Sequence, residues 1–347
     1  MDSIQSPEPS VSVTRDMHAT SGITAMRDAN ERLLSIVRSR FETPNIVVLE
    51  LSGDGGEALP AWTPGAHIDL VLPSGKSRQY SLCGNPSDRS RYCIAVLRET
   101  MGRGGSLEIH EIARKDMVLT VRGPRNHFEL VEAKAYLFIA GGIGITPMLP
   151  MIRAAEAAGA PWRLVYGGRS KATMGFFNEI LERQGGAVTL LPEDEAGRPD
   201  LDALLATVGS GEVVYGCGPG GMLTALEEAS VRRGLSNVLH IERFGAAENM
   251  PPPADLVGDS AFEVELRTSG ITLQVPPDRS LGDTLLDAGI PVPFSCQEGY
   301  CGSCETRVLE GVPDHRDTIL TDEEKAEGTL MMVCCGRSKT PRLVLDL

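Results

Sequence analysis

Three cysteines lie close together near the C-terminal end of the chain, in the segment SCQEGYCGSC at 295–304. Cys296, Cys301 and Cys304 are separated by four and then by two residues, and Cys334 follows after a further 29. Five of the eight cysteines lie within the last 52 residues. Thiols grouped in this way can form disulfides, bind a zinc ion or hold an iron-sulfur cluster.

The spacing favours a [2Fe-2S] cluster over the two alternatives. Structural disulfides are rare in a reducing cytosol, the compartment that the rest of the sequence indicates. Structural zinc usually takes two close cysteine pairs, whereas this region has one. The pattern C-x4-C-x2-C with a distant fourth cysteine is that of plant-type [2Fe-2S] proteins. Gly299 and Gly302 would let the loop wrap closely and direct backbone N–H groups at the sulfur atoms.

The fourth ligand can be Cys334 or Cys335, which are adjacent. We predict Cys334, because it follows a short apolar stretch (MMV) and the run resembles the end of the ferredoxin pattern. Cys335 is then a small packed side chain, and Cys83 and Cys93 are predicted to fill apolar interior space.

Two glycine-rich turns follow apolar, strand-like segments in the middle of the chain. GGIGITP at 141–147 precedes a helix predicted over 147–158, and YGCGPGGM at 215–222 precedes one predicted over 221–233. Such turns leave backbone N–H groups and a helix N-terminus for an anion such as a dinucleotide pyrophosphate, although many are simply turns. The second turn would place Cys217 at the carboxyl edge of the sheet, where ligands bind.

Two further segments could bind a phosphate and a flat ring. RQYSL at 78–82 supplies the positive charge of Arg78 and the hydroxyl of Ser81, and GRGGS at 102–106 supplies free N–H donors. Taken singly, each has a simpler interpretation as a strand arginine or a surface turn.

The elements that must position these residues fall into successive regions. Short alternating apolar runs up to about His127, with little helical pattern, predict an antiparallel barrel. From Glu132 to Phe244, strand-like runs alternate with helical stretches, which predicts a parallel sheet covered by helices. Pro- and Ala-rich residues at 245–260 indicate a semi-rigid linker.

Composition excludes several classes of protein. The chain has 347 residues, 41% hydrophobic and 23% charged, as in soluble multidomain proteins. Its net charge of −14 disfavours binding to nucleic acid or to an anionic membrane. From residue 261 onward, 15 acidic residues face 8 basic ones, which suits docking to a basic partner or simply a soluble acidic domain.

Two segments bear on localisation. Residues 135–152 are 18 residues without a charge, but three glycines and Pro147 interrupt them, so we expect a strand, a turn and a helix rather than a membrane span. The N-terminal segment lacks the basic start and apolar stretch of a secretory signal, and we expect a disordered tail. These features predict a cytoplasmic protein.

In this order, RQYS, GGIGITP, YGCGPGGM, ERF (242–244) and the cysteine pattern resemble reductases of the phthalate dioxygenase reductase and vanillate demethylase reductase type. The resemblance covers nearly everything after about Met26. It implies a multidomain α+β protein with an antiparallel flavin-binding β-barrel, a ferredoxin-reductase-like α/β nucleotide domain and a C-terminal β-grasp [2Fe-2S] ferredoxin domain. The predicted boundaries are 1–25 for the tail, 26–131 for the barrel, 132–245 for the nucleotide domain, 246–260 for the linker and 261–347 for the ferredoxin domain.

The resemblance also implies the cofactors and the residues that bind them. FMN would lie against the barrel, with Ser81 near its reacting nitrogen and Phe244 stacked on its ring. The remaining flavin residues would be Arg78, Tyr80, Leu82, Gly104, Gly105, Ser106 and Thr146. The nucleotide residues would be Gly142, Gly144, Pro147, Arg169, Ser170, Cys217, Gly218 and Pro219. The cluster ligands would be Cys296, Cys301, Cys304 and Cys334.

The chemistry expected of these residues and cofactors is the transfer of electrons from NAD(P)H to the cluster. NAD(P)H gives two electrons as a hydride, whereas the cluster accepts one at a time, so the flavin must stand between them. Ser81, Cys217 and Glu242 are predicted to position the reacting rings, the alternative for Glu242 being an ion-paired surface carboxylate. NADH is preferred to NADPH, although Arg169 and Lys171 could meet a 2′-phosphate.

The resemblance further implies that a monomer delivers its electrons to a Rieske-type non-haem iron oxygenase. One rival interpretation gives the electrons to a cytochrome P450 or another oxygenase. The other is a non-enzymatic protein whose cysteines sense redox state or hold zinc, and such a zinc protein would be colourless.

Overall fold

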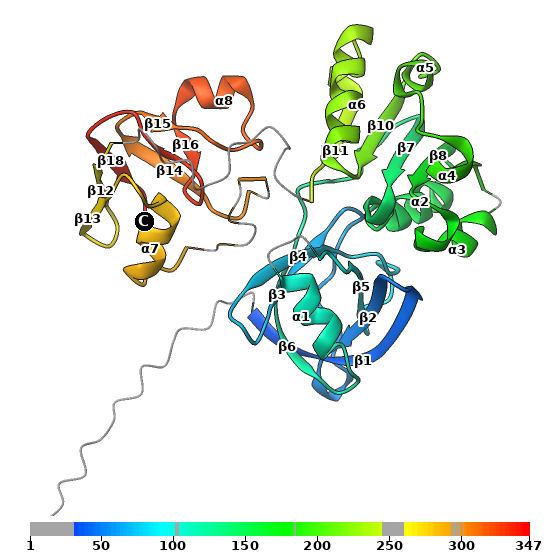
Figure 1. Cartoon of the computed structure of the whole chain (residues 1–347), viewed down its shortest axis with the longest axis horizontal. Helices are drawn as coiled ribbons and strands as arrows, with labels where there is room; N and C mark the ends of the chain where they lie inside the picture. The colour runs from blue at the N-terminus through cyan, green and yellow to red at the C-terminus, as the bar shows by residue number, and fades with distance from the viewer. Residues whose placement is uncertain are drawn as a thin grey trace, which may run out of the picture.

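Three large β-sheets, each with its own helices, and one two-stranded ribbon make up the described part of the chain (Figure 1). The computed structural model describes residues 31–100, 104–183, 185–244, 260–292, 294, 297, 299–300 and 302–347. In Figure 1 the first unit is blue to cyan, the second green, and the third yellow to red. The predicted tail and nearly all of the predicted linker lie outside the described residues.

The first sheet is an antiparallel barrel. Its strands are β1 (Glu31–Thr43), β2 (Ile46–Ser52), β3 (His67–Val71), β4 (Ser77–Ser81), β5 (Tyr92–Leu97) and β6 (Val118–Arg125). They are ordered β4-β3-β6-β1-β2-β5, and a bridge between Leu82 and Ile94 joins the two edges. Apolar residues from alternate positions fill the interior, among them Leu49, Ile68 and Val121. The predicted barrel is confirmed.

One helix, α1 (Gly105–Ile112), lies within this unit, where the sequence pattern showed little helical character. The backbone N–H and hydroxyl of Ser74, in the β3–β4 turn, donate to the Glu108 carboxylate and hold the helix against the barrel. Ile109 is the fully buried side chain of α1. Because tertiary contacts, including the burial of Ile109 and two hydrogen bonds from Ser74, stabilise so short a helix, the local pattern could not reveal it.

The second sheet is parallel throughout, with the order β11-β10-β7-β8-β9. Its strands are β7 (Ala135–Gly141), β8 (Trp162–Gly168), β9 (Ala187–Pro192), β10 (Glu212–Cys217) and β11 (Leu239–Glu242). Its helices are α2 (Met148–Ala157), α3 (Phe177–Leu181), α4 (Glu193–Ala196), α5 (Leu201–Leu205) and α6 (Gly220–Arg233). The apolar 135–152 segment therefore folds as β7, a glycine turn and the start of α2.

The central strand β7 explains the continuous apolar run in the sequence. Phe138 and Ala140 belong to one apolar core, whereas Leu137 and Ile139 belong to another. Successive residues of a strand point to opposite faces, so both faces of this strand are buried. Among the described residues, no helix is long and apolar enough to cross a membrane.

The third sheet is mixed, with the order β13-β12-β18-β14-β16. Its strands are β12 (Phe262–Leu266), β13 (Ile271–Val275), β14 (Glu305–Glu310), β16 (Leu330–Met332) and β18 (Arg342–Leu345). A small ribbon pairs β15 (Pro313–Asp314) with β17 (Arg337–Ser338), and the helices are α7 (Leu281–Asp287) and α8 (Asp322–Glu327). The strands β12 and β18 are parallel and bring the two ends of this unit together, as expected of a β-grasp domain.

A first prediction concerns Gly144, which lies between β7 and α2. A Cβ atom on Gly144 would come within 2.2 Å of the Cys217 carbonyl oxygen, which belongs to backbone that cannot retreat easily. We expect Gly144→Ala to cost about 3 kcal/mol of stability by overpacking. Gly209→Ala is the control, because its Cβ would meet nothing closer than 4.0 Å. Urea unfolding followed by fluorescence measures both, and equal midpoints would contradict the prediction.

Candidate active site

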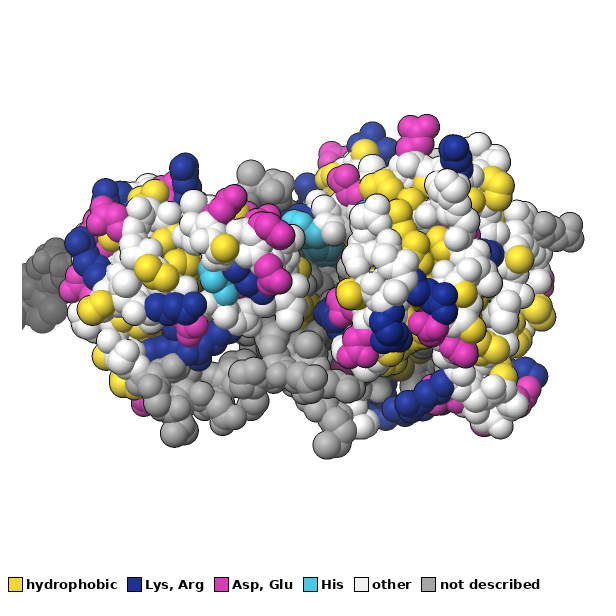
Figure 2. All heavy atoms as spheres, turned by 90° about the horizontal axis from the view of Figure 1, so that it is seen from above, with side chains coloured by type: hydrophobic (Ala, Val, Ile, Leu, Met, Phe, Trp, Pro, Cys, Tyr) yellow, Lys and Arg dark blue, Asp and Glu magenta, His cyan; other side chains and the backbone are white. Residues whose placement is uncertain are grey.

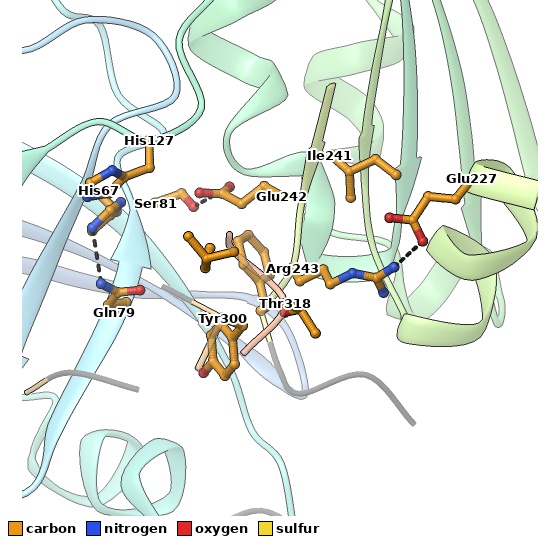
Figure 3. Close-up of a pocket in the computed structure, with 12 residues that line it drawn as sticks. His67, Gln79, Ser81, His127, Glu227, Ile241, Glu242, Arg243, Tyr300 and Thr318 are labelled. Atoms are coloured by element: carbon orange, nitrogen blue, oxygen red, sulfur yellow. Dashed lines mark hydrogen bonds and ion pairs between the residues drawn. The ribbon is translucent and has the colours of Figure 1, made fainter. Parts of the chain in front are cut away.

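A cleft lies where the three units meet (Figure 3). The barrel contributes His67, Gln79, Ser81 and His127, and the parallel sheet contributes its last strand and the residues after it. Tyr300, Thr318 and Ile319 come from the third unit. In Figure 2 histidine side chains, in cyan, lie beside the groove between the two lobes of the molecule. Groups bound by all three units would therefore meet here.

The ends of three strands bring Ser81, Cys217 and Glu242 together. Ser81 ends β4, and its hydroxyl lies 3.4 Å from the Glu242 carboxylate at the end of β11. Glu242 is the register partner of Cys217 on the neighbouring strand β10. Three residues that the sequence separates by up to 161 positions thus share one corner of the cleft.

The environment of this corner keeps its acidic groups neutral. Burial raises the pKa of Glu242 to about 8, although the hydrogen bond from Ser81 lowers it. Part of the Glu242 surface is accessible to solvent, but protein atoms surround the carboxylate itself. Desolvation therefore raises its pKa by more than the Ser81 hydrogen bond lowers it. Burial, and then the nearby Glu242, raise the pKa of the Cys217 thiol well above its usual value. These contacts favour a positioning role for Glu242 over that of an ion-paired surface carboxylate.

A positive cradle lies at the N-terminus of α1. A Cβ on Gly105 would come within 2.7 Å of the Arg78 side chain, so this glycine lets the guanidinium stem lie against the start of the helix. The Lys76 ammonium is 3.4 Å from the Cβ position of Gly104, which has a φ of +80°. The backbone N–H of Glu99 donates to the Ser106 hydroxyl at 3.1 Å. Two cations and a helix N-terminus fit a phosphate group.

The other residues predicted for the flavin differ in their positions. Tyr80 is partly buried against the barrel core, and burial raises its pKa. Phe244 lines the cleft and is 38% exposed, which leaves its ring accessible for stacking. Leu82 is fully buried in the barrel core, so it can offer only its backbone. Thr146 is 2% exposed and donates to the Ile143 carbonyl; it is absent from the described lining of the cleft.

The two glycine turns pack backbone against backbone at the carboxyl edge of the parallel sheet. A Cβ on Gly141 would lie 2.6 Å from Pro219, and one on Gly218 would lie 2.9 Å from the Gly141 Cα. Gly142 has a φ of +54° and open space around it, and Pro147 precedes α2. No side chain can fit between the turns, so their N–H groups remain close to any bound pyrophosphate.

Residues after β8 extend the nucleotide side of the site. Arg169 is exposed, and its carbonyl accepts from the Asp194 N–H at 3.3 Å. Ser170 caps the short turn that follows through a hydrogen bond with Thr173. The Lys171 ammonium lies 2.8 Å from the carboxylate of Glu195, on α4. An acidic turn thus stands beside the basic residues that could have met a 2′-phosphate.

The described part of the cluster loop has the geometry of a tight wrap. Gln297, Gly299 and Gly302 all have φ between +57° and +74°. Cys304 and Cys334 are 2% and 5% exposed within the third core. The other two predicted ligands, Cys296 and Cys301, lie outside the described residues.

Cys335 occupies a different position from its neighbour. Its sulfur is 3.8 Å from the Met332 carbonyl and would be 2.5 Å from a Cβ on Gly299, so it packs against the loop backbone. Cys334 instead has its Cα against Gly282 of α7. The buried Cys304 and Cys334 fit two of the four thiolate positions that a [2Fe-2S] cluster requires.

Several cleft residues were missed by the sequence reasoning. Lys76 at the phosphate cradle, and His67 and His127 in the cleft, belong to none of the motifs. Gln79 stands within RQYSL, where Arg78 and Ser81 were the predicted residues. His67 and Gln79 lie on the paired strands β3 and β4, and only tertiary contact brings them to the third unit.

Comparison with known proteins supports this arrangement. The model of the 2Fe-2S iron-sulfur cluster binding domain matches residues 264–339. Phenoxybenzoate dioxygenase subunit beta of Ectopseudomonas oleovorans is 44% identical over 88% of this chain and 94% of its own length. Vanillate O-demethylase oxidoreductase of a Pseudomonas species is 42% identical over 89% and 97%.

Two solved structures resemble the whole chain. The structure of phthalate dioxygenase reductase is 36% identical, covers 91% of this chain and 98% of its own, and has a TM-score of 0.69. An intact type IV self-sufficient cytochrome P450 monooxygenase is 40% identical with a TM-score of 0.81, and this chain spans 41% of its length.

A flavin barrel, a nucleotide sheet and a plant-type ferredoxin unit around one cleft define an NAD(P)H-dependent iron-sulfur flavoprotein oxidoreductase. Its relatives match over nearly their full length. The chain belongs to the family of phthalate dioxygenase reductase and vanillate O-demethylase oxidoreductase.

The chain's own residues bind and orient the reactants in this chemistry. A bound flavin supplies the exchange of a hydride for single electrons. Ser81 and the protonated Glu242 offer hydrogen-bonding groups without a charge at pH 7. Their corner of the cleft therefore does not repel the negative charge of a transferred hydride. Cys217, kept as a neutral thiol, closes the same corner.

A second prediction follows from the pKa of Glu242. Glu242 is protonated below pH 8 and ionised above it, and its ionised carboxylate would oppose the arrival of hydride. We expect kcat/KM for NADH, with ferricyanide as acceptor, to fall as pH rises through about 8. Glu242→Gln should remove this fall, whereas Glu228→Gln on the exposed face of α6 should retain it. A glutamine variant with the wild-type pH profile would refute the assignment.

Proposed function

We propose that this chain is the reductase component of a Rieske-type aromatic-ring oxygenase or demethylase system. Electrons pass from NADH through FMN to the [2Fe-2S] cluster and then to the oxygenase. The observation that carries the proposal is the single cleft, in which Ser81, Glu242 and Tyr300 from the three units line one space. A hydride donor, a flavin and a one-electron acceptor need to meet in such a place.

The names of the relatives support an oxygenase as acceptor. They include vanillate O-demethylase oxidoreductase, phthalate 4,5-dioxygenase oxygenase reductase subunit and phthalate dioxygenase reductase, at 36% to 42% identity. A cytochrome P450 is the second candidate acceptor, because a self-sufficient P450 contains a similar unit within its own chain. The full-length match to separate reductases favours the first candidate.

The predicted site residues take these roles in the proposal. Arg78, Gly104, Gly105 and Ser106 hold the FMN phosphate, Tyr80 and Phe244 contact its ring, and Ser81 lies at its reacting edge. Leu82 contributes its backbone, and Thr146 supports the glycine turn from behind. Gly142, Gly144, Pro147, Arg169, Ser170, Gly218 and Pro219 bind the nucleotide, and Cys217 and Glu242 position its nicotinamide. Cys296, Cys301, Cys304 and Cys334 ligate the cluster.

The same proposal includes the domain limits, the flavin and the state of the protein. The units extend over 26–131, 132–245 and 261–347, with a tail at 1–25 and a linker at 246–260. The compact phosphate cradle at α1, with two cations and a helix N-terminus, suits a terminal phosphate and thus FMN rather than FAD. One chain carries every redox site, so a monomer suffices. We place this monomer in the cytoplasm.

The third prediction concerns the identity of both cofactors. Mass analysis of the flavin released by mild acid should give FMN, and an adenine-bearing flavin would refute this assignment.

The ion pair between Lys171 and Glu195 leaves a 2′-phosphate beside an acidic turn, so kcat/KM should favour NADH over NADPH. Glu195→Gln removes one negative charge beside the 2′-phosphate position. It should narrow the preference for NADH over NADPH about tenfold, which corresponds to one pKa unit of interaction free energy.

The fourth prediction tests the electron path with two neighbouring cysteines. In the wild type, NADH should reduce flavin and cluster, and the protein should then support turnover by a purified Rieske oxygenase. Cys334→Ser should lose acid-labile sulfide and oxygenase turnover, whereas NADH-dependent ferricyanide reduction persists. Cys335→Ser should retain the cluster, because the Cys335 thiol packs against the Gly299 backbone.

Two outcomes would contradict the proposal. If the wild type contains no iron and sulfide, its cluster function fails. If it reduces a cytochrome P450 but no Rieske oxygenase, the second candidate acceptor replaces the first.

A further inference from the structure

Ser303 makes a direct polar contact between the described part of the cluster loop and the barrel. It lies between two predicted cluster ligands, Cys301 and Cys304, in a segment that follows the linker. Its hydroxyl oxygen is 3.2 Å from the Gln79 side-chain nitrogen and 3.3 Å from an Arg125 guanidinium nitrogen. These partners lie 224 and 178 residues earlier in the sequence. Two donors from different strands, β4 and β6, thus converge on one acceptor of the third unit.

Each of the two donors also contacts a second side chain of the barrel, which fixes its position independently of the cluster loop. The Arg125 guanidinium pairs with Asp69 on β3, whose side chain is 2% exposed. The Gln79 amide nitrogen lies 3.1 Å from the His67 imidazole, which is itself 5% exposed (Figure 3). Each nitrogen carries two hydrogens, one for its barrel partner and one for Ser303. The two donors to Ser303 are therefore each held by a buried group of the barrel, Asp69 or His67.

A pair of stacked histidine rings lies beside the polar contact. The ring of His127 stacks on that of His67, with the ring centres 5.6 Å apart. A Cβ on Gly302 would lie 3.9 Å from the His127 ring and 3.9 Å from Ile319. The neighbouring Gly302 thus faces the His127 ring, with room for a further carbon atom between them. Both histidines line the cleft that Ser81 and Glu242 also line.

We propose that Ser303 is a positioning residue that docks the cluster loop on the barrel, by accepting hydrogen bonds from Gln79 and Arg125. The inference rests on the proposed electron path and adds the contact that holds its two ends together. Because electron transfer weakens steeply with distance, a fixed contact beside the ligands sets the rate of this step. The docking contact belongs to the loop itself, so the linker need not determine how the two units meet.

The contact also predicts a selective effect. Two net hydrogen bonds stabilise the docked arrangement, and their loss should lower its equilibrium constant about tenfold. Reduction of the flavin by NADH uses the other side of the cleft and does not require docking. Transfer from flavin to cluster does require it.

The fifth prediction tests this with Ser303→Ala, Ser303→Thr and the control Ser269→Ala in the holoprotein. Ser269 is an exposed serine in the turn between β12 and β13, remote from the barrel contacts. Stopped-flow absorbance after mixing with NADH measures flavin reduction and cluster reduction separately. Ser303→Ala should slow the second about tenfold and leave the first unchanged. Ser303→Thr retains the hydroxyl and should restore the rate, and Ser269→Ala should resemble the wild type.

Hydrogen–deuterium exchange provides a readout that does not depend on turnover. In Ser303→Ala, the backbone from 302 to 310 and strand β4 should both exchange faster. Gln79→Leu removes one of the two hydrogen bonds from the barrel side without altering the cluster loop. The double variant Gln79→Leu/Ser303→Ala should then be no slower than Ser303→Ala alone, because Ser303→Ala already removes the hydrogen bond that Gln79→Leu removes.

Two results would overturn the docking role of Ser303. The first is unchanged electron transfer together with unchanged exchange in Ser303→Ala. The second is a lost or shifted cluster signal in that variant, by iron content or reduction potential, because Ser303 would then act on the cluster itself. If the wild type fails to reduce its cluster, the proposed electron path is wrong, and the exchange data still decide whether Ser303 docks.

Discussion

The structure depends on one constraint, that three units, each built on its own sheet, must present their edges to a single cleft. The barrel edge carrying Ser81 meets the carboxyl edge of the parallel sheet carrying Glu242, and the contact between them is a 3.4 Å hydrogen bond. Ligands of open α/β sheets bind at that edge. The chain satisfies the constraint by ending β11 at Glu242 and leaving Phe244 beside the cleft.

Electrostatics at this cleft follow from its burial. Carboxyl and thiol groups removed from water resist ionisation, so Glu242 and Cys217 add polar atoms to the site without adding charge at neutral pH. The positive charge is concentrated instead at the start of α1, on Arg78 and Lys76. In the proposed function, this division would place attraction for phosphate at one end of the flavin site and a neutral surface at the other, where hydride would pass.

Parts of this arrangement could be predicted from the sequence, because they depend on local pattern. The runs WRLVYGG and AVTLLP coincide with β8 and β9. Both glycine turns end buried strands, and they meet because β7 and β10 are neighbours in the sheet. Helix α1 was not predictable, since tertiary contacts with Ser74 stabilise it. The contact between Gln79 and Ser303 joins residues 224 positions apart, and no local pattern encodes it.

The reductase core is separable from the choice of acceptor. A similar unit occurs as a separate chain in phthalate dioxygenase reductase and within the longer chain of a self-sufficient P450. The interior that joins nucleotide, flavin and cluster can therefore stay the same while the acceptor differs. In the proposed function, an acceptor would dock on the outer surface of the third unit, where α8 carries Asp322, Glu323 and Glu324 in its first turn. Exposed charges alter encounter rates and partner choice at little cost to folding, so acceptor specificity can change without disturbing the cleft.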